Sequence, residues 1–151
     1  MIKITMTFAA ILLVTATLSF AQNTVKPETQ TQKEVGPVRS SAAYAEVLLR
    51  KTELQADLES FTNDYTEQNP KIMDIRFELV ILTKDIDRLF AVRPTETTKL
   101  TEALGKMVVR RAFLATDLNR MLRTLNADHP EVKRLKRKVE IFAAAIKEIL
   151  G

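Results

Sequence analysis

The sequence predicts an all-α protein made of tandem duplicated helical hairpins of coiled-coil type, which pack as a four-helix bundle or an elongated helical assembly. Three observations support this prediction. From Ser41 onward, apolar residues recur alternately three and four positions apart, which is the spacing of a helical seam. The pattern of the first half returns sixty residues later in the second half. Each half also carries a central proline, which favours a turn over a continuous helix.

Residues 1–21 predict a secretory signal peptide. Lys3 precedes an apolar run, and Ser19 and Ala21 are small residues at the two positions that a signal peptidase requires. The alternative is an uncleaved N-terminal membrane anchor, but the run from Thr5 to Ala21 is short for a span of about 20 apolar residues. Cleavage would start the mature chain near Gln22 and place it in the periplasm or outside the cell. Because the chain has no cysteine, lipid attachment behind a bacterial signal is excluded.

The rest of the chain divides into four segments. Residues 22–40 are polar, contain two prolines and one glycine, and predict a flexible linker. Residues 41–92 predict hairpin 1 and residues 99–151 predict hairpin 2. Residues 93–98 predict a connecting loop, because Pro94 cannot continue a helix and Thr97 or Thr98 can cap the next one.

The two hairpins are related by a shift of sixty positions. Apolar matches alone are weak evidence within a heptad pattern, but three other kinds of residue also recur, and together they indicate a tandem duplication. These matches are Pro70 with Pro130, Asp57 with Asp117, and the basic seam residues Lys51 with Arg111.

The prolines leave two structures open, a bent continuous helix or a hairpin. A proline inside a helix costs about 3 kcal/mol, whereas in the first turn it costs almost nothing. The flanking residues favour the hairpin. Asn69 directly precedes Pro70 as a natural N-cap, while Asp128 is an N-cap candidate with Glu131 three residues on, as in a capping box. Asn126 is placed to end the preceding helix in a left-handed conformation.

His129, the only histidine, is the counterpart of Asn69 and is expected to be exposed in the turn before Pro130, with a hydrogen bond near the helix start. A metal or catalytic role would need partners that the neighbouring sequence lacks. No metal site is therefore predicted here.

The segment FLATDLNRMLRTLNADHPEVKRLKRKVEIF resembles the periplasmic coiled-coil segment of polysaccharide chain-length determinant proteins. In that family a leucine-rich helix leads into a turn with the pattern His-Pro-acidic-Val, which stands here as His129 to Val132. The segment around Asn69 and Pro70 resembles a degenerate copy. The resemblance covers each hairpin, and not the membrane spans or the α/β region of the family. It implies a helical hairpin in the cell envelope and an accessory role in polysaccharide export.

Extra apolar residues and a basic cluster outside the seams predict an interaction surface. Either the two hairpins cover the apolar stripes by packing together, or the stripes serve oligomerisation or a partner protein. The basic cluster is either a solvated helix face or a contact for an anionic polymer or a membrane surface. The residues are Met73, Phe77, Val80, Val109, Phe113, Lys133, Arg134, Lys136 and Arg137.

Charge differs between the hairpins. Residues 44–91 contain six basic and ten acidic residues, a balance of −4, while residues 104–151 contain eleven and five, a balance of +6. Opposite charges orient packing more than they stabilise it. Binding of nucleic acid is not expected, since no aromatic residues interleave with the basic cluster.

These features predict a non-catalytic exported structural or interaction protein of the cell envelope, which works as a homo-oligomer or with an envelope protein partner. A periplasmic holdase-type chaperone is the alternative, favoured by the apolar stripes. An enzyme is not expected: with no cysteine, one histidine and three glycines, the chain offers no nucleophile–base pair and no phosphate-binding loop, and no cofactor is predicted.

Overall fold

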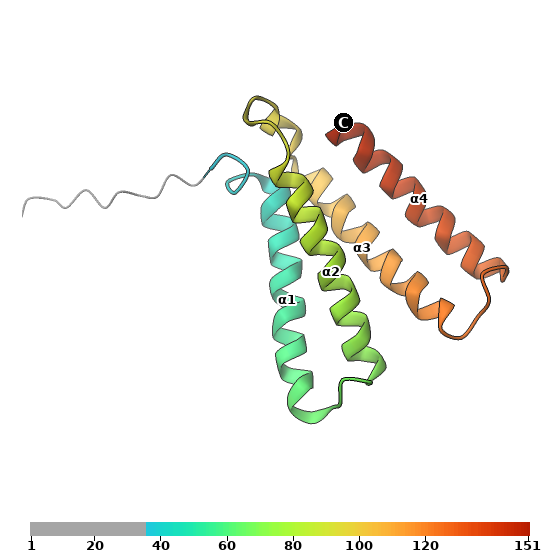
Figure 1. The fold of residues 1–151 in the computed structure, drawn as a ribbon. Helices are drawn as coiled ribbons and strands as arrows, with labels where there is room; N and C mark the ends of the chain where they lie inside the picture. Colours follow the sequence, from blue (N-terminus) through green and yellow to red (C-terminus); the bar gives the residue numbers. More distant parts are fainter. Residues whose placement is uncertain (1–35) are drawn as a thin grey trace, which may run out of the picture. The chain divides into compact units, whose positions relative to one another are not determined.

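The computed structural model describes residues 36–151, in which four α-helices and one short 3-10 helix are joined by turns, with no strand among these residues (Figure 1). The prediction of an all-α helical bundle is confirmed. The predicted signal peptide and residues 22–35 of the predicted linker lie outside the described residues. The elements are α1 (Ala42–Asp64), α2 (Pro70–Phe90), η1 (Pro94–Lys99), α3 (Glu102–Leu122) and α4 (Pro130–Leu150).

Helix α1 is preceded by a turn that contributes to the core. Ser41 is its N-cap, and its hydroxyl oxygen accepts a hydrogen bond from the backbone N–H of Tyr44 at 3.3 Å. The four residues before Ser41 form a turn, and Val38 within it is buried in the core. The expected linker therefore ends before Val38 rather than at residue 40, because an apolar side chain beside the first helix gains from burial.

The first hairpin turns at Asn69 and Pro70. The side-chain oxygen of Asn69 accepts a hydrogen bond from the backbone N–H of Lys71 at 2.9 Å, which caps α2. Pro70 occupies the first helical position, where a backbone N–H would have no acceptor within the helix, so its absence costs nothing. The chain thus reverses here instead of bending within one helix.

The second hairpin turns at His129 and Pro130, with a different cap from the expected one. His129 is the N-cap of α4, and its Nδ1 accepts a hydrogen bond from the backbone N–H of Glu131 at 3.3 Å. The expectation that Asp128 caps this helix is wrong, because Pro130 fixes the first helical position and leaves His129 directly before it. Glu131 enters this contact through its backbone N–H and not as the acidic partner of a capping box.

The ends of α3 also differ from expectation. Its N-cap is Thr101, whose hydroxyl oxygen accepts a hydrogen bond from the backbone N–H of Leu104 at 3.3 Å, so neither Thr97 nor Thr98 caps it. Thr97 lies inside η1, and its hydroxyl donates to the carbonyl of Pro94. At the other end Asn126 is not left-handed, since no residue other than glycine has a positive φ within residues 36–151. Its side-chain oxygen instead accepts from the backbone N–H of Asp128 at 3.1 Å, which tightens the turn.

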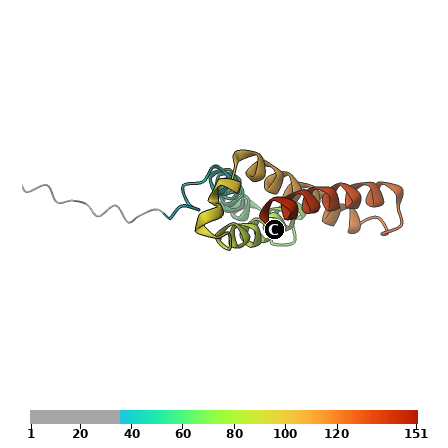
Figure 2. The same cartoon turned by 90° about the horizontal axis from the view of Figure 1, so that it is seen from above.

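Helices α1, α2 and α3 pack against one another, while α4 packs chiefly against α3 (Figures 1 and 2). Apolar residues spaced three and four apart supply most of the interior, whereas Tyr65 directly after α1 is 52% exposed. The core contains seam residues from all four helices and Leu100 from the connection. The most completely buried large side chains are Val47, Ile72, Leu82, Leu89, Leu104, Val108 and Val132.

A glycine permits the closest approach of α1 and α3. A Cβ at Gly105 would lie 2.7 Å from the Cβ of Glu46 and 2.9 Å from both the Cα and the carbonyl oxygen of Ala43. Both Gly105 and Ala43 are buried. Only a residue without a side chain fits between these two backbones.

Candidate functional site

The most unusual polar feature of the described residues is an acidic face on α2. Asp74, Glu78 and Asp85 are only 8%, 4% and 2% exposed. Their spacings of four and seven residues place them on one side of a helix. An unpaired buried carboxylate is strongly unfavourable, so each of these groups needs a partner. Each of them has at least one arginine.

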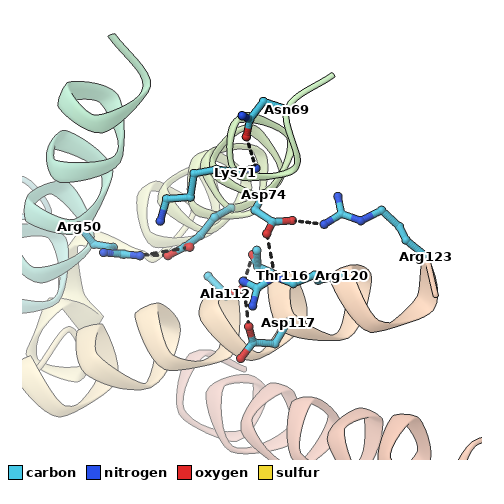
Figure 3. Close-up of polar contacts among 10 residues, drawn as sticks. Arg50, Asn69, Lys71, Asp74, Ala112, Thr116, Asp117, Arg120 and Arg123 are labelled. Atoms are coloured by element: carbon cyan, nitrogen blue, oxygen red, sulfur yellow. Dashed lines mark hydrogen bonds and ion pairs between the residues drawn. The ribbon is translucent and has the colours of Figure 1, made fainter. Parts of the chain in front are cut away.

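Asp74 connects the two hairpins through two arginines of α3 and the turn after it. The Nε of Arg120 donates to one carboxylate oxygen at 2.8 Å, and Nη2 of Arg123 donates to the other at 2.5 Å (Figure 3). The hydrogen bond to Asp74 raises the pKa of the Arg120 guanidinium above its ordinary value. Asp74 therefore fixes the far end of α3 against the start of α2.

Glu78 connects the two helices of the first hairpin. Arg50 of α1 donates to both of its carboxylate oxygens, from Nε at 2.8 Å and from Nη2 at 3.2 Å (Figure 3). The two parallel hydrogen bonds form the bidentate arrangement that is geometrically most specific. The hydrogen bond to Glu78 also raises the pKa of Arg50.

Asp85 connects α2 to the middle of α3. One carboxylate oxygen accepts from Arg111 and the other from Arg88 at 3.4 Å. Burial raises the pKa of the Asp85 carboxyl above its ordinary value, although the charge and the hydrogen bond of Arg111 oppose this shift. Within the described part of the chain, the Nε of Arg111 is buried and has no acceptor.

All three carboxylates pair with arginines. Their effect is therefore to fix the positions of the helices relative to one another. Reasoning from the sequence did not single out Asp74, Glu78 or Asp85. Two signals were available: the three acids share one face of α2, and Arg111 interrupts an apolar seam. Two of the three acids bind arginines of the other hairpin, in agreement with the opposite charge balances of the halves.

The predicted turn residues do not come together into one site. Asn69 with Pro70 and His129 with Pro130 lie at the tips of different hairpins (Figure 1). Asp128 forms an ion pair with Lys133 at 2.9 Å between side chains that are both largely exposed. The hydrogen bonds of these residues stay within their own turns and helix ends.

The predicted interaction surface is distributed over three helices. Among its apolar members, Met73, Val80 and Phe113 are exposed, while Phe77 and Val109 are partly buried. Val109 and Phe113 of α3 line a shallow groove that also includes Glu46 and Arg50 of α1. The four basic members, Lys133, Arg134, Lys136 and Arg137, are all exposed on α4.

A cleft of about 800 Å³ lies where the end of α2, the η1 connection, α3 and the last turns of α4 meet. Its lining includes Arg88, Arg111 and Lys147 from three different helices. No reasoning from the sequence pointed to this cleft, because its walls come from segments that are far apart in the chain.

Within residues 36–151, no group of three histidine, cysteine or acidic side chains is placed to hold a metal ion. The helices of this same region are all too short or too polar to span a membrane. Comparison of the chain with protein-family models, with curated proteins and with solved structures finds no match.

Proposed function

We propose that this chain is a non-catalytic, exported helical protein of the cell envelope that works by self-association through its exposed helix faces. The observation that supports this proposal most is the outer position of α4, which packs chiefly against α3 and leaves its other faces open. A helix of this kind can contact a second chain without any rearrangement of the core.

Apolar side chains on the open faces support association. Single exposed apolar residues are common on proteins, but Met73 and Val80 lie seven residues apart on one face of α2, with Phe77 between them. On α4, Ile141 is 54% exposed and follows Arg137 by one helical turn on the basic side. Such residues gain free energy when a partner removes them from water.

The charge distribution supports a second copy as the partner. The exposed basic side chains of α4 have the opposite sign to exposed acidic side chains of the first hairpin, such as Glu59, Asp64 and Asp87. In a twofold dimer, the basic side chains of α4 in each copy would meet exposed acidic side chains of the first hairpin in the other, and both contacts form at once. Complementary charge of this kind orients association.

The test is sedimentation velocity on the purified protein over a range of concentration and salt. We expect a defined oligomer that dissociates as salt rises, since salt screens exposed charges. Val80→Lys should weaken the oligomer, whereas Thr95→Lys, at an exposed position of η1 outside the helix faces, should not. A monomer at every concentration and salt would contradict self-association.

Export is tested separately, by N-terminal sequencing of the protein recovered from cells. The resemblance to chain-length determinant hairpins and the signal-like N-terminus support an envelope location. A start at Gln22 is expected. A protein that retains Met1 and fractionates with the soluble cell interior would contradict export.

A holdase-type chaperone is the second candidate, favoured by the spread of exposed apolar residues over all four helices. Leu49 of α1 is 59% exposed, and Val80, Phe113 and Ile141 represent the other three helices. A holdase should suppress aggregation of an unfolded client at stoichiometric amounts while remaining monomeric. Self-association without such suppression would favour the first proposal.

A further inference from the structure

The cleft at the end of α2 has a strongly basic lining. Five of its residues are arginine or lysine, and they come from α2, the connection that contains η1, α3 and α4. Segments that are distant in the sequence thus bring positively charged side chains to the same cleft. These five are Arg88, Arg93, Lys99, Arg111 and Lys147.

Nearby acids offset only part of this charge. Glu96 pairs with Arg93 at 2.5 Å and with Lys99 at 3.5 Å. Asp85 pairs with Arg88 and Arg111. Among these side chains, five basic against two acidic groups leave an excess of three positive charges.

Two of the cations have unused capacity to bind an anion. A guanidinium carries five N–H donors, and the only side-chain hydrogen bond of Arg111 among residues 36–151 goes to Asp85. Lys147 is an exposed member of the lining and pairs with no acidic side chain of the same residues. A ligand between them would meet donors from α3 and α4 together.

Part of the cleft lining is apolar. Ile146 is buried, while Val92 and Leu150 are partly buried, and all three line the hollow beside the cations. The volume of about 800 Å³ is within the range of small-molecule sites. Basic and apolar side chains in one lining suit a ligand with one anionic end and one aliphatic end.

We propose that this cleft binds an anionic amphiphile, with its carboxylate or phosphate headgroup between Arg111 and Lys147 and its alkyl chain along Val92, Ile146 and Leu150. The positive side chains attract the headgroup, and burial of the ligand's alkyl chain adds affinity that an anion without such a chain lacks. This binding is independent of self-association through the outer helix faces.

The experiment is isothermal titration calorimetry on the full chain with three probes below their micelle-forming concentrations: dodecanoate, dodecyl phosphate and inorganic phosphate. We expect both amphiphiles to bind once per chain, and inorganic phosphate to bind at least about tenfold more weakly because it buries no alkyl chain. The alkyl chains of the two amphiphiles differ by one carbon, worth about 0.8 kcal/mol, so a larger difference in affinity shows whether a carboxylate or a phosphate headgroup is preferred.

Two variants test the basic and the apolar parts of the lining, each with a matched control. Lys147→Gln should weaken dodecanoate binding by about tenfold, as expected when a charged contact is lost. Lys136→Gln, an exposed lysine about 16 Å earlier on the same helix, should leave it unchanged. Leu150→Asn should reduce the advantage of dodecanoate over inorganic phosphate, and Ile141→Asn, outside the cleft, should not.

Three outcomes would overturn the proposal. The first is that neither amphiphile binds to folded wild-type chain, as judged by circular dichroism of the same sample. The second is that Lys136→Gln weakens binding as much as Lys147→Gln, which would indicate diffuse attraction to a basic surface. The third is that inorganic phosphate binds as tightly as dodecyl phosphate, which would remove any role for the apolar part of the lining.

Discussion

Asp85 of α2 accepts a hydrogen bond from Arg111 of α3, so a buried carboxylate of the first hairpin is held by the second hairpin. The side chain of Asp85 is 3% exposed and that of Arg111 is 15% exposed. Neither group is well hydrated, and each depends on the other for compensation of its charge. This pair, with the Asp74 pairs further along α2, determines how the two hairpins meet.

Removal of one partner should destabilise the protein strongly. We expect Arg111→Met to lower the free energy of unfolding by about 3 to 5 kcal/mol, because Asp85 is left buried without its main partner. The measurement is equilibrium unfolding in urea, followed by circular dichroism. The double variant Asp85→Leu with Arg111→Met should recover most of the loss, because two apolar residues need no pairing.

The matched control is an exposed ion pair on the first hairpin. Arg76 and Glu67 lie 2.6 Å apart, but their side chains are 51% and 61% exposed. Arg76→Met should cost less than about 1 kcal/mol, since exposed pairs contribute little. Equal losses at Arg76 and Arg111 would show that burial does not govern the strength of these pairs.

The raised pKa of Asp85 predicts a pH dependence of stability. For a carboxyl whose pKa is higher in the folded than in the unfolded chain, the folded state binds the proton more tightly. The contribution to stability is therefore full below the ordinary pKa of 3.8 and is lost as pH rises through the folded value. Relative to Asp85→Asn, the wild type should gain stability as pH falls through this window.

The measurement is urea unfolding of both proteins at a series of pH values, with the difference in free energy plotted against pH. The other carboxyl groups titrate in both proteins, so their effects cancel in the difference. A difference that stays constant, or that falls with decreasing pH, would contradict a raised pKa at Asp85.

The helix caps predict unequal effects at three positions in the two hairpin turns. Asn69→Ala should cost about 1 kcal/mol of stability, because it removes the acceptor for the backbone N–H of Lys71. His129→Ala should cost less than this, since its hydrogen bond is longer, and His129→Asn should restore the loss or improve on it. Asp128→Ala should change stability by less than about 0.5 kcal/mol, as is usual for surface positions.

Thermal and urea unfolding of these four variants provides the test. The comparison of Asp128→Ala with His129→Ala is the informative one, because both residues lie in the same turn. A larger loss of stability at Asp128 than at His129 would show that Asp128, and not His129, caps α4.

The close contact at Gly105 predicts that a methyl group at this position destabilises the folded protein. Alanine favours a helix over glycine by about 1 kcal/mol, so Gly105→Ala would stabilise an isolated helix. In the folded protein its Cβ would meet the backbone of Ala43 at 2.9 Å, and backbone cannot move aside as a side-chain end can. We expect a net destabilisation of about 1 to 3 kcal/mol, the usual range for overpacking.

Gly36→Ala is the control for this substitution, because a Cβ at Gly36 would meet no atom within 4 Å. The melting temperatures of both variants, measured by circular dichroism, should fall for Gly105→Ala and stay near that of the wild type for Gly36→Ala. A rise at Gly105 would mean that α1 and α3 separate at little cost.

The helices and the turns between them could be predicted from the sequence because the signals for both are local. The spacing of Val47, Leu54, Ile75 and Leu82 defines apolar helix faces, and Pro70 breaks the helix wherever the rest of the chain lies. The N-cap of α4 could not be predicted in this way. Asp128 and His129 can both accept a hydrogen bond from the next turn, and only the path of the backbone selects one.

Which faces meet is decided by tertiary structure, because burial depends on neighbours that the spacing within one helix does not specify. Asp74, Glu78 and Asp85 look like solvated acids until α1 and α3 cover them with arginines. In the same way, the outer position of α4 and the cleft that joins Arg111 to Lys147 exist only once the hairpins have packed. The sequence by itself determined the helical elements and where they turn; the packing of the hairpins determined which charges are buried and which surfaces remain open.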